Sequence, residues 1–160
     1  MSASRRSDAA ALAAQIRELA DRRAIEDALI AYAHALDARN YLRLRECLAA
    51  DVRVKYGGAP WLAGVEQVAQ FCARALGSLD ATQHRLGSID VKLERGRAAS
   101  VSYLCAEHLK DGRRFTVGGR YVDRWTRTPA GWRIAQRELV ILWTDGDPRV
   151  LEEPERPSSP

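Results

Sequence analysis

Four side chains in this sequence have the types needed to move a proton on a bound molecule: Asp37, His84, Tyr32 and Arg137. Asp37 falls near the C-terminal end of a long predicted helix, where a carboxylate meets the negative end of the helix dipole. An unfavourable residue in such a place often marks a functional site. A histidine beside a buried carboxylate can act as a general base, because the carboxylate holds one ring nitrogen protonated and stabilises the imidazolium. His84 is therefore a candidate base, and Asp37 is a candidate for the carboxylate that would orient it.

Tyr32 and Arg137 are candidates for contacting oxygen or negative charge on the substrate. A buried tyrosine hydroxyl can polarise a carbonyl or assist a departing oxygen. Arg137 is a cation on the apolar side of a predicted strand, where it could bind an anionic group or steady developing charge. Both residues also have a structural interpretation. Tyr32 could be a core residue, and Arg137 could pair with an acid such as Glu107, Asp123 or Glu138.

The direction of His84 depends on the strand that it opens. Simple alternation groups His84 with Leu86 rather than with Ile89, unless a bulge at Gly87-Ser88 swaps the two faces. His84 could therefore bond only to backbone, in which case Asp37 would simply end its helix.

Other side chains are weaker candidates for the site. His34 falls on the polar side of the first helix and His108 near the Asp111-Gly112 turn, so we expect both to be exposed. Further polar and aromatic residues are expected to bind the substrate: Tyr56, Trp61, Tyr103, Glu107 and Tyr121.

The first helix is predicted to begin at Ser7 or Asp8 and to end near Asn40. Leu12, Ile16 and Leu19 form a first apolar stripe. We interpret a second set of apolar residues as its continuation: Ile25, Leu29, Tyr32 and Leu36.

The remaining elements predict an α+β fold in which a curved antiparallel sheet wraps around three helices and leaves an internal pocket. Two shorter helices are expected over residues 41–49 and 64–76, with a strand at 51–56 and a possible partner at Trp61-Leu62. Four longer strands should follow, over residues 82–93, 99–105, 115–125 and 132–144. Glycines inside these strands fit bulges or bends: Gly87, Gly118 and Gly119.

Composition limits the classes of function. With 160 residues, the chain is expected to form one domain over residues 9–146, with a flexible segment at 1–8 and an extended or disordered tail at 147–160. A net charge of +4 without a dense basic run argues against nucleic-acid binding. Three isolated cysteines suggest neither a metal site nor disulfides. No apolar run suits a membrane span or a signal peptide, so we expect a cytoplasmic protein.

Several short segments together resemble the SnoaL-like branch of the nuclear-transport-factor-2-like cone superfamily. They are Arg23-Ala24-Ile25-Glu26-Asp27, Tyr32 with Asp37, Gln83-His84, Gly118 to Trp125, Gly131-Trp132-Arg133-Ile134 and Gly146-Asp147-Pro148-Arg149. Within it the chain is similar to cofactor-free lyases: scytalone dehydratase, bile-acid 7α-dehydratase and hexachlorocyclohexane dehydrochlorinase.

This resemblance implies an Asp–His dyad at Asp37 and His84, with the histidine removing a proton from carbon. Tyr32 matches a tyrosine of the bile-acid enzyme, whereas the dehydrochlorinase has a lysine there. Arg137 resembles an arginine of the dehydrochlorinase. The implied function is a dehydratase-like lyase or an isomerase that needs no cofactor or metal, acts on a hydrophobic small molecule and forms a homodimer or homotrimer. The alternative is a non-catalytic binding or subunit-type cone.

Overall fold

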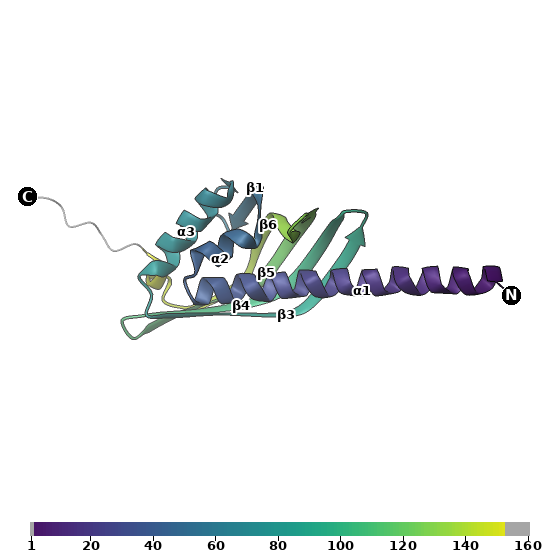
Figure 1. Ribbon diagram of the computed structural model, residues 1–160. Coiled ribbons are helices and arrows are strands. Elements are labelled where there is room, and N and C mark those ends of the chain that lie inside the picture. Colours follow the sequence, from purple (N-terminus) through teal and green to yellow (C-terminus); the bar gives the residue numbers. More distant parts are fainter. Residues whose placement is uncertain (1, 153–160) are drawn as a thin grey trace, which may run out of the picture.

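A six-stranded curved sheet wraps around the C-terminal half of a long helix in the computed structural model (Figure 1), which describes residues 2–152 and side chains from Ser7 onward. The elements along the chain are α1 (Ser2–Asp37), α2 (Tyr41–Glu46), β1 (Leu48–Tyr56), β2 (Leu62–Ala63), α3 (Val65–Gly77), β3 (Ala81–Glu94), β4 (Arg97–Lys110), β5 (Arg113–Thr128), β6 (Gly131–Gly146) and η1 (Pro148–Leu151). The expected α+β cone is confirmed. None of the helices within residues 2–152 has the length and apolar character of a membrane span.

The strands lie in the order β2-β1-β6-β5-β4-β3, and one pair departs from the predicted antiparallel plan. β1 pairs with β6 in parallel, with Val54 opposite Arg137. No hairpin joins these two strands, since α3 and three hairpin-connected strands separate them along the chain, and nothing therefore forces them to run in opposite directions. The sheet is mixed, and its curvature leaves room between its concave face and the helices.

A bulge in β3 brings two sets of side chains to the concave face. Its pairing with β4 shifts between Gly87 and Asp90, and Ser88 has a φ of 47°. His84 lies on the inward face before the bulge, and Val91 lies on the same face after it. The predicted bulge is confirmed, and it lets the start of β3 face the pocket while the end of β3 packs against α1.

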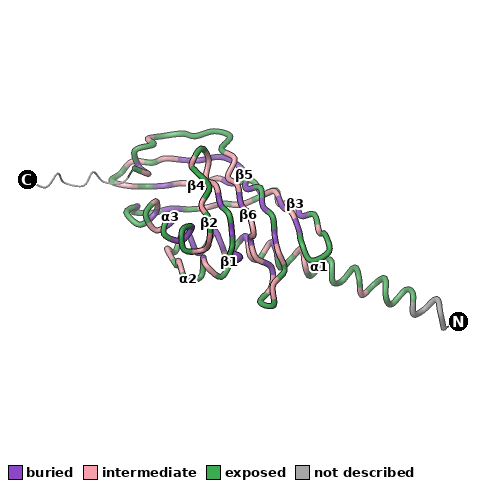
Figure 2. Tube along the Cα trace, turned by 90° about the horizontal axis from the view of Figure 1, so that it is seen from above, coloured by how far each residue is buried: buried purple, intermediate pink, exposed green. Residues whose placement is uncertain are grey.

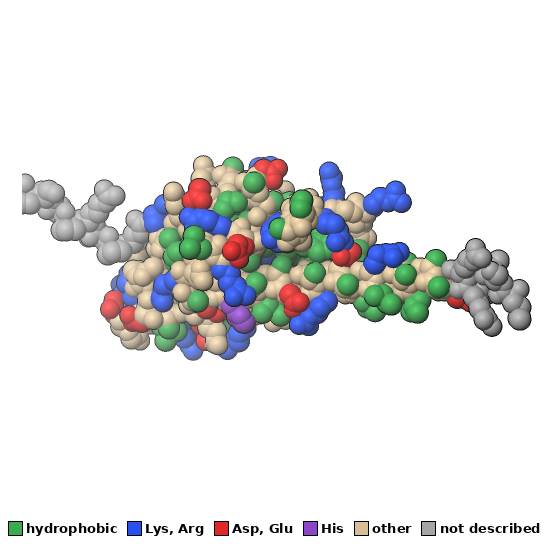
Figure 3. All heavy atoms as spheres, in the orientation of Figure 1, with side chains coloured by type: hydrophobic (Ala, Val, Ile, Leu, Met, Phe, Trp, Pro, Cys, Tyr) green, Lys and Arg blue, Asp and Glu red, His purple; other side chains and the backbone are tan. Residues whose placement is uncertain are grey.

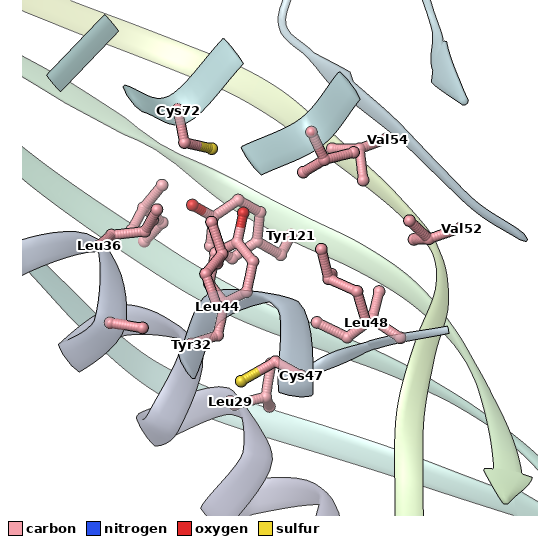
Figure 4. Packing of buried hydrophobic residues seen from close by; sticks show 14 of the residues in the cluster. Leu29, Tyr32, Leu36, Leu44, Cys47, Leu48, Val52, Val54, Cys72 and Tyr121 are labelled. Atoms are coloured by element: carbon pink, nitrogen blue, oxygen red, sulfur yellow. The ribbon is translucent and has the colours of Figure 1, made fainter. Parts of the chain in front are cut away.

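The core face of α1 is confirmed for its C-terminal half. Figure 4 shows Tyr32 and Leu36 of α1 pointing toward Tyr121 of β5 and Cys72 of α3. The predicted continuation toward the N-terminus is wrong, because Leu12, Ile16 and Leu19 are exposed. In Figure 2 this part of the helix projects beyond the sheet.

Several boundaries differ from those predicted. α1 begins at Ser2 rather than Ser7, and α2 ends at Glu46 because the chain enters β1 at Leu48. The tail expected to be extended begins with η1, whose Val150 is fully buried. Residues 153–160 of that predicted tail lie outside the described residues.

A substitution at Gly119 tests whether the close approach of backbones at the register shift between β5 and β6 requires a glycine. A Cβ there would lie 2.5 Å from the backbone oxygen of Val140, beside a register shift between β5 and β6. We expect Gly119→Ala to lower the free energy of unfolding by about 2 kcal/mol, since the backbone must move to make room. Urea denaturation measures this, with Gly87→Ala as the control, because a Cβ at Gly87 meets no atom within 4 Å. Equal stabilities of the two variants would contradict the explanation.

Candidate functional site

Asp37 and His84 meet where α1 ends and β3 begins. The His84 ring nitrogen Nδ1 lies 2.6 Å from Asp37 Oδ1, and the His84 backbone N–H donates to Oδ1 and Oδ2 at 3.1 and 3.0 Å. Asp37 is the last residue of α1, so its side chain reaches past the helix end to the neighbouring strand. The expected contact is therefore present, and the catalytic roles of both residues remain a prediction.

The hydrogen bonds to Asp37 decide which ring nitrogen of His84 is protonated. Burial raises the pKa of Asp37, but the bonds from the His84 ring and backbone more than offset this, and the net effect is a lowered pKa. The carboxylate is thus ionised at neutral pH and accepts hydrogen bonds without donating any. Nδ1 of neutral His84 must then carry the proton, which leaves Nε2 as an acceptor.

A cavity of about 440 Å³ lies beside His84, between the concave face of the sheet and helices α1 and α3. Most of its walls are apolar, formed by Leu36, Phe71, Leu104, Phe115, Val117 and Leu139. The side chain of His84 is only 7% exposed and lines this cavity. A hydrophobic molecule of moderate size could enter and meet the imidazole.

Tyr56 rather than Tyr32 is the tyrosine of this pair that lines the cavity. The two hydroxyl oxygens are 2.5 Å apart, and Tyr56 lines the cavity whereas Tyr32 lies behind it in the core. Burial raises the pKa values of both tyrosines well above their usual range. Both are therefore protonated at neutral pH, and Tyr32 can donate to Tyr56. Tyr121 also lines the cavity, as predicted, with its ring against Tyr32.

Arg137 is in the core and does not line the cavity, which corrects its predicted contact with substrate. Its Nε and Nη2 atoms each bond Asp123 at 2.8 Å, and its guanidinium lies over the rings of Tyr32 and Tyr121 at 4.1 and 3.9 Å from their centroids. Asp123 and Arg137 are register partners on β5 and β6. A fully buried cation requires such a partner, so the structural alternative is confirmed.

His108 was expected to be exposed, but it is buried and lines the cavity. Its Nδ1 lies 3.0 Å from Thr82 Oγ1, and its ring centroid is 5.7 Å from that of His84. His108 lies on the same face of β4 as Leu104 and Ala106, and the structure shows that this is the covered face. Burial lowers the pKa of His108 to about 4, and the His84 side chain acts in the same direction. His108 therefore adds a neutral imidazole to the site.

Three predicted substrate-binding residues lie outside the cavity. Tyr103 and Glu107 occupy the outward face of β4, where Glu107 lies 3.6 Å from Arg85. Trp61 precedes β2 and is 37% exposed, with Arg53 over its ring. Period-two alternation places residues on one face of a strand without telling which face is covered, and this explains the error in β4. Among the described residues, no group of three His, Cys, Asp or Glu side chains is arranged to hold a metal ion.

The depressed pKa of His108 gives a pH-dependent stability. The unfolded chain, with a histidine pKa near 6.5, binds a proton that the folded chain excludes until about pH 4. Stability from this residue is therefore complete above pH 6.5 and lost as the pH falls toward 4, by about 2 kcal/mol at pH 5. We expect His108→Gln to lose less stability than wild type between pH 7 and 5 in urea denaturation. The exposed His34→Gln serves as the control, and a His108→Gln profile identical to wild type would refute the assignment.

Comparisons with known proteins identify sequence relatives and structures with a similar fold. The SnoaL-like domain family matches residues 17–138. The uncharacterized protein Rv2910c of Mycobacterium tuberculosis is 30% identical over 127 residues, which cover 76% of this chain and 86% of the relative. A candidate scytalone dehydratase from Novosphingobium aromaticivorans has a TM-score of 0.76 at 21% identity, over 81% of this chain and 89% of that one. Hexachlorocyclohexane dehydrochlorinase type 3 from Novosphingobium barchaimii has a TM-score of 0.75 at 13% identity, over 84% and 94%. The chain therefore belongs to the SnoaL-like domain family.

Proposed function

We propose that this protein is a cofactor-independent lyase of the dehydratase kind, or an isomerase, acting on a hydrophobic small molecule. The observation that carries this proposal is the 2.6 Å contact between Asp37 and His84 at the wall of an apolar cavity. An imidazole fixed in this way has one nitrogen committed to the carboxylate and the other available to a bound molecule. The dehydratase and dehydrochlorinase descriptions of structural neighbours are in keeping with it.

His84 Nε2 removes a proton from the carbon next to a carbonyl group in the proposed reaction. The C–H electron pair moves into the carbonyl to form an enolate, and Asp37 stabilises the imidazolium through Nδ1. In a lyase, the enolate expels a hydroxyl group from the adjacent carbon, and His84 returns its proton to that oxygen so that water leaves. In an isomerase, His84 returns the proton to a different carbon.

Tyr56 is the proposed donor to the carbonyl oxygen on which negative charge develops. Tyr56 lines the cavity, and its hydroxyl lies 2.5 Å from that of Tyr32 and 3.4 Å from Cys72 Sγ. With Tyr32 as the donor to Tyr56, the Tyr56 hydroxyl can turn its own hydrogen from Cys72 to a bound carbonyl. This assigns to Tyr56 the role predicted for Tyr32, which becomes a positioning residue. His108 offers a further contact, because Thr82 occupies Nδ1 and the opposite nitrogen is the one available to a ligand.

The walls of the cavity define the substrate class. Apolar side chains exclude water from the reacting atoms, which strengthens the interaction between imidazolium and enolate. A volume of about 440 Å³ suits a compound with one to three carbon rings rather than a polymer. Hydrophobic β-hydroxy ketones are therefore the compounds to test first.

Substitution of the dyad tests the proposal directly. We expect Asp37→Asn and His84→Gln to lower kcat/KM at least about 100-fold for any substrate found in a panel of cyclic β-hydroxy ketones. His84→Gln removes the base, and Asp37→Asn removes the carboxylate that orients it and stabilises the imidazolium. Formation of the conjugated enone is followed by ultraviolet absorbance, and deuterium uptake from heavy water detects abstraction without elimination. His34→Gln, three residues from Asp37 but exposed, should retain full activity.

Two outcomes would overturn the assignment. Undiminished turnover in either dyad variant would remove His84 as the base. Tight binding of panel compounds without deuterium uptake or elimination by wild type, and with equal affinity in both variants, would instead support a non-catalytic binding protein.

The two tyrosines are distinguished by their effect on turnover. Tyr56→Phe should lower kcat about 10- to 100-fold with little change in KM, because the lost hydrogen bond is strongest in the transition state. Tyr32→Phe should have a smaller effect, since Tyr56 keeps its own hydroxyl as the donor. Steady-state kinetics with the same substrate measure both variants, and a larger loss in Tyr32→Phe would reverse the two roles.

A further inference from the structure

The N-terminal part of α1 projects from the body and carries an apolar stripe of its own, here called the arm stripe: Leu12, Ile16 and Leu19. These side chains are 58%, 56% and 66% exposed. In Figure 2 this part of the helix is mostly green beyond the edge of the sheet, and Figure 3 shows exposed hydrophobic side chains along it. Among the side chains described from Ser7 onward, the first of this helix to make an ion pair with the body is Asp21, which bonds Arg127.

The arm stripe is not an extension of the face that α1 packs into the core. At about 100° per residue, the core residues from Ile25 to Leu36 point roughly 130° away from the arm stripe. No element of the same body that covers the core face can therefore also cover Leu12, Ile16 or Leu19. A helix in a protein gains most of its stability from packing of its apolar face. The exposed arm stripe is therefore a candidate surface for binding a partner.

We propose that the arm stripe binds the arm stripe of a second copy of this chain, with the two helices antiparallel. Leu12 then lies opposite Leu19 of the partner subunit, and Leu19 opposite Leu12 of the partner subunit. This self-complementary contact closes as a two-fold dimer and leaves no further copy to add.

Charges at the two ends of the arm stripe favour this direction over a parallel one. Asp8 lies one turn before Leu12 and Arg23 one turn after Leu19, both beside the stripe on the helical wheel. In the antiparallel pair, Asp8 lies near Arg23 of the partner subunit. Parallel helices would bring like charges together at both ends.

The apolar pairing of Leu12 with Leu19 and the charged pairing of Asp8 with Arg23 are centred on the same position in the helix. Leu12 and Leu19 are centred on the position between Gln15 and Ile16, and so are Asp8 and Arg23. One two-fold axis therefore satisfies the apolar and the charged contacts together. Arg23 bonds Asp27 of its own helix at 2.8 Å, which holds it at the edge of the stripe.

Sedimentation velocity on the full chain tests this surface across about 1 to 100 µM, where weak dimers dissociate. We expect wild type to dimerise, and Leu12→Glu with Leu19→Glu in one chain to raise the dimer dissociation constant about 100-fold or more. Leu42→Glu is the matched control, since Leu42 is a 75% exposed leucine on α2, and it should dimerise like wild type. Circular dichroism checks that all variants remain folded.

Disulfide trapping tests the direction of the helices. In a Cys105→Ser background, a chain with Leu12→Cys mixed with a chain with Leu19→Cys should cross-link to each other on oxidation. Cross-links within the Leu12→Cys chain alone, at a higher yield than in the mixture, would indicate a parallel pair and overturn the proposed contact.

Three other results would overturn the proposal. Wild type could be monomeric throughout the concentration range, or the double variant could remain dimeric, which would place the interface elsewhere. Flotation of wild type with phosphatidylcholine–phosphatidylglycerol vesicles, lost in the double variant, would instead identify a lipid surface as the occupant of the arm stripe.

Discussion

The hydrogen bonds between the Asp37 carboxylate and His84 are the interaction on which the candidate site depends. It accepts bonds from both the ring and the backbone N–H of His84, so it fixes the end of α1 to the start of β3 as well as the orientation of the imidazole. The same bonds keep the carboxylate ionised despite its partial burial. Structure and acid–base chemistry are therefore joined at one side chain, and any change at Asp37 affects both.

The shape of the sheet supplies the space that this pair needs. Register shifts in β3 and between β5 and β6 bend the strands, and Gly119 lets the backbones approach where a Cβ would collide. The bulge at Ser88 also changes the face on which alternating residues fall. Without it, His84 and the core residues of the same strand would lie on opposite sides of the sheet.

Ionisable side chains are stabilised in different ways in the core and beside the cavity. Arg137 and Asp123 neutralise each other in the core, where an unpaired charge would be costly, and the Arg137 guanidinium also lies over the rings of Tyr32 and Tyr121. At the cavity, His108 is kept neutral by burial, and the ionised Asp37 is compensated by hydrogen bonds. His84 and Tyr56 line this mainly apolar cavity and are the groups proposed to act on a bound molecule, with His108 as a further contact.

The sequence by itself determined the element order and the core half of α1, because these follow from local periodicity and turn residues. The pairing of Asp37 with His84 was expected from the family resemblance, whereas periodicity left the bulge in β3 and the direction of His84 open. Only the tertiary structure decided that His108 faces inward and that Tyr56 rather than Tyr32 lines the cavity. It also decided that Arg137 forms an ion pair with Asp123 in the core. Those outcomes depend on which face of each strand is covered and on which partners lie across the sheet. Alternation along one strand carries no record of either, since it is identical for both faces.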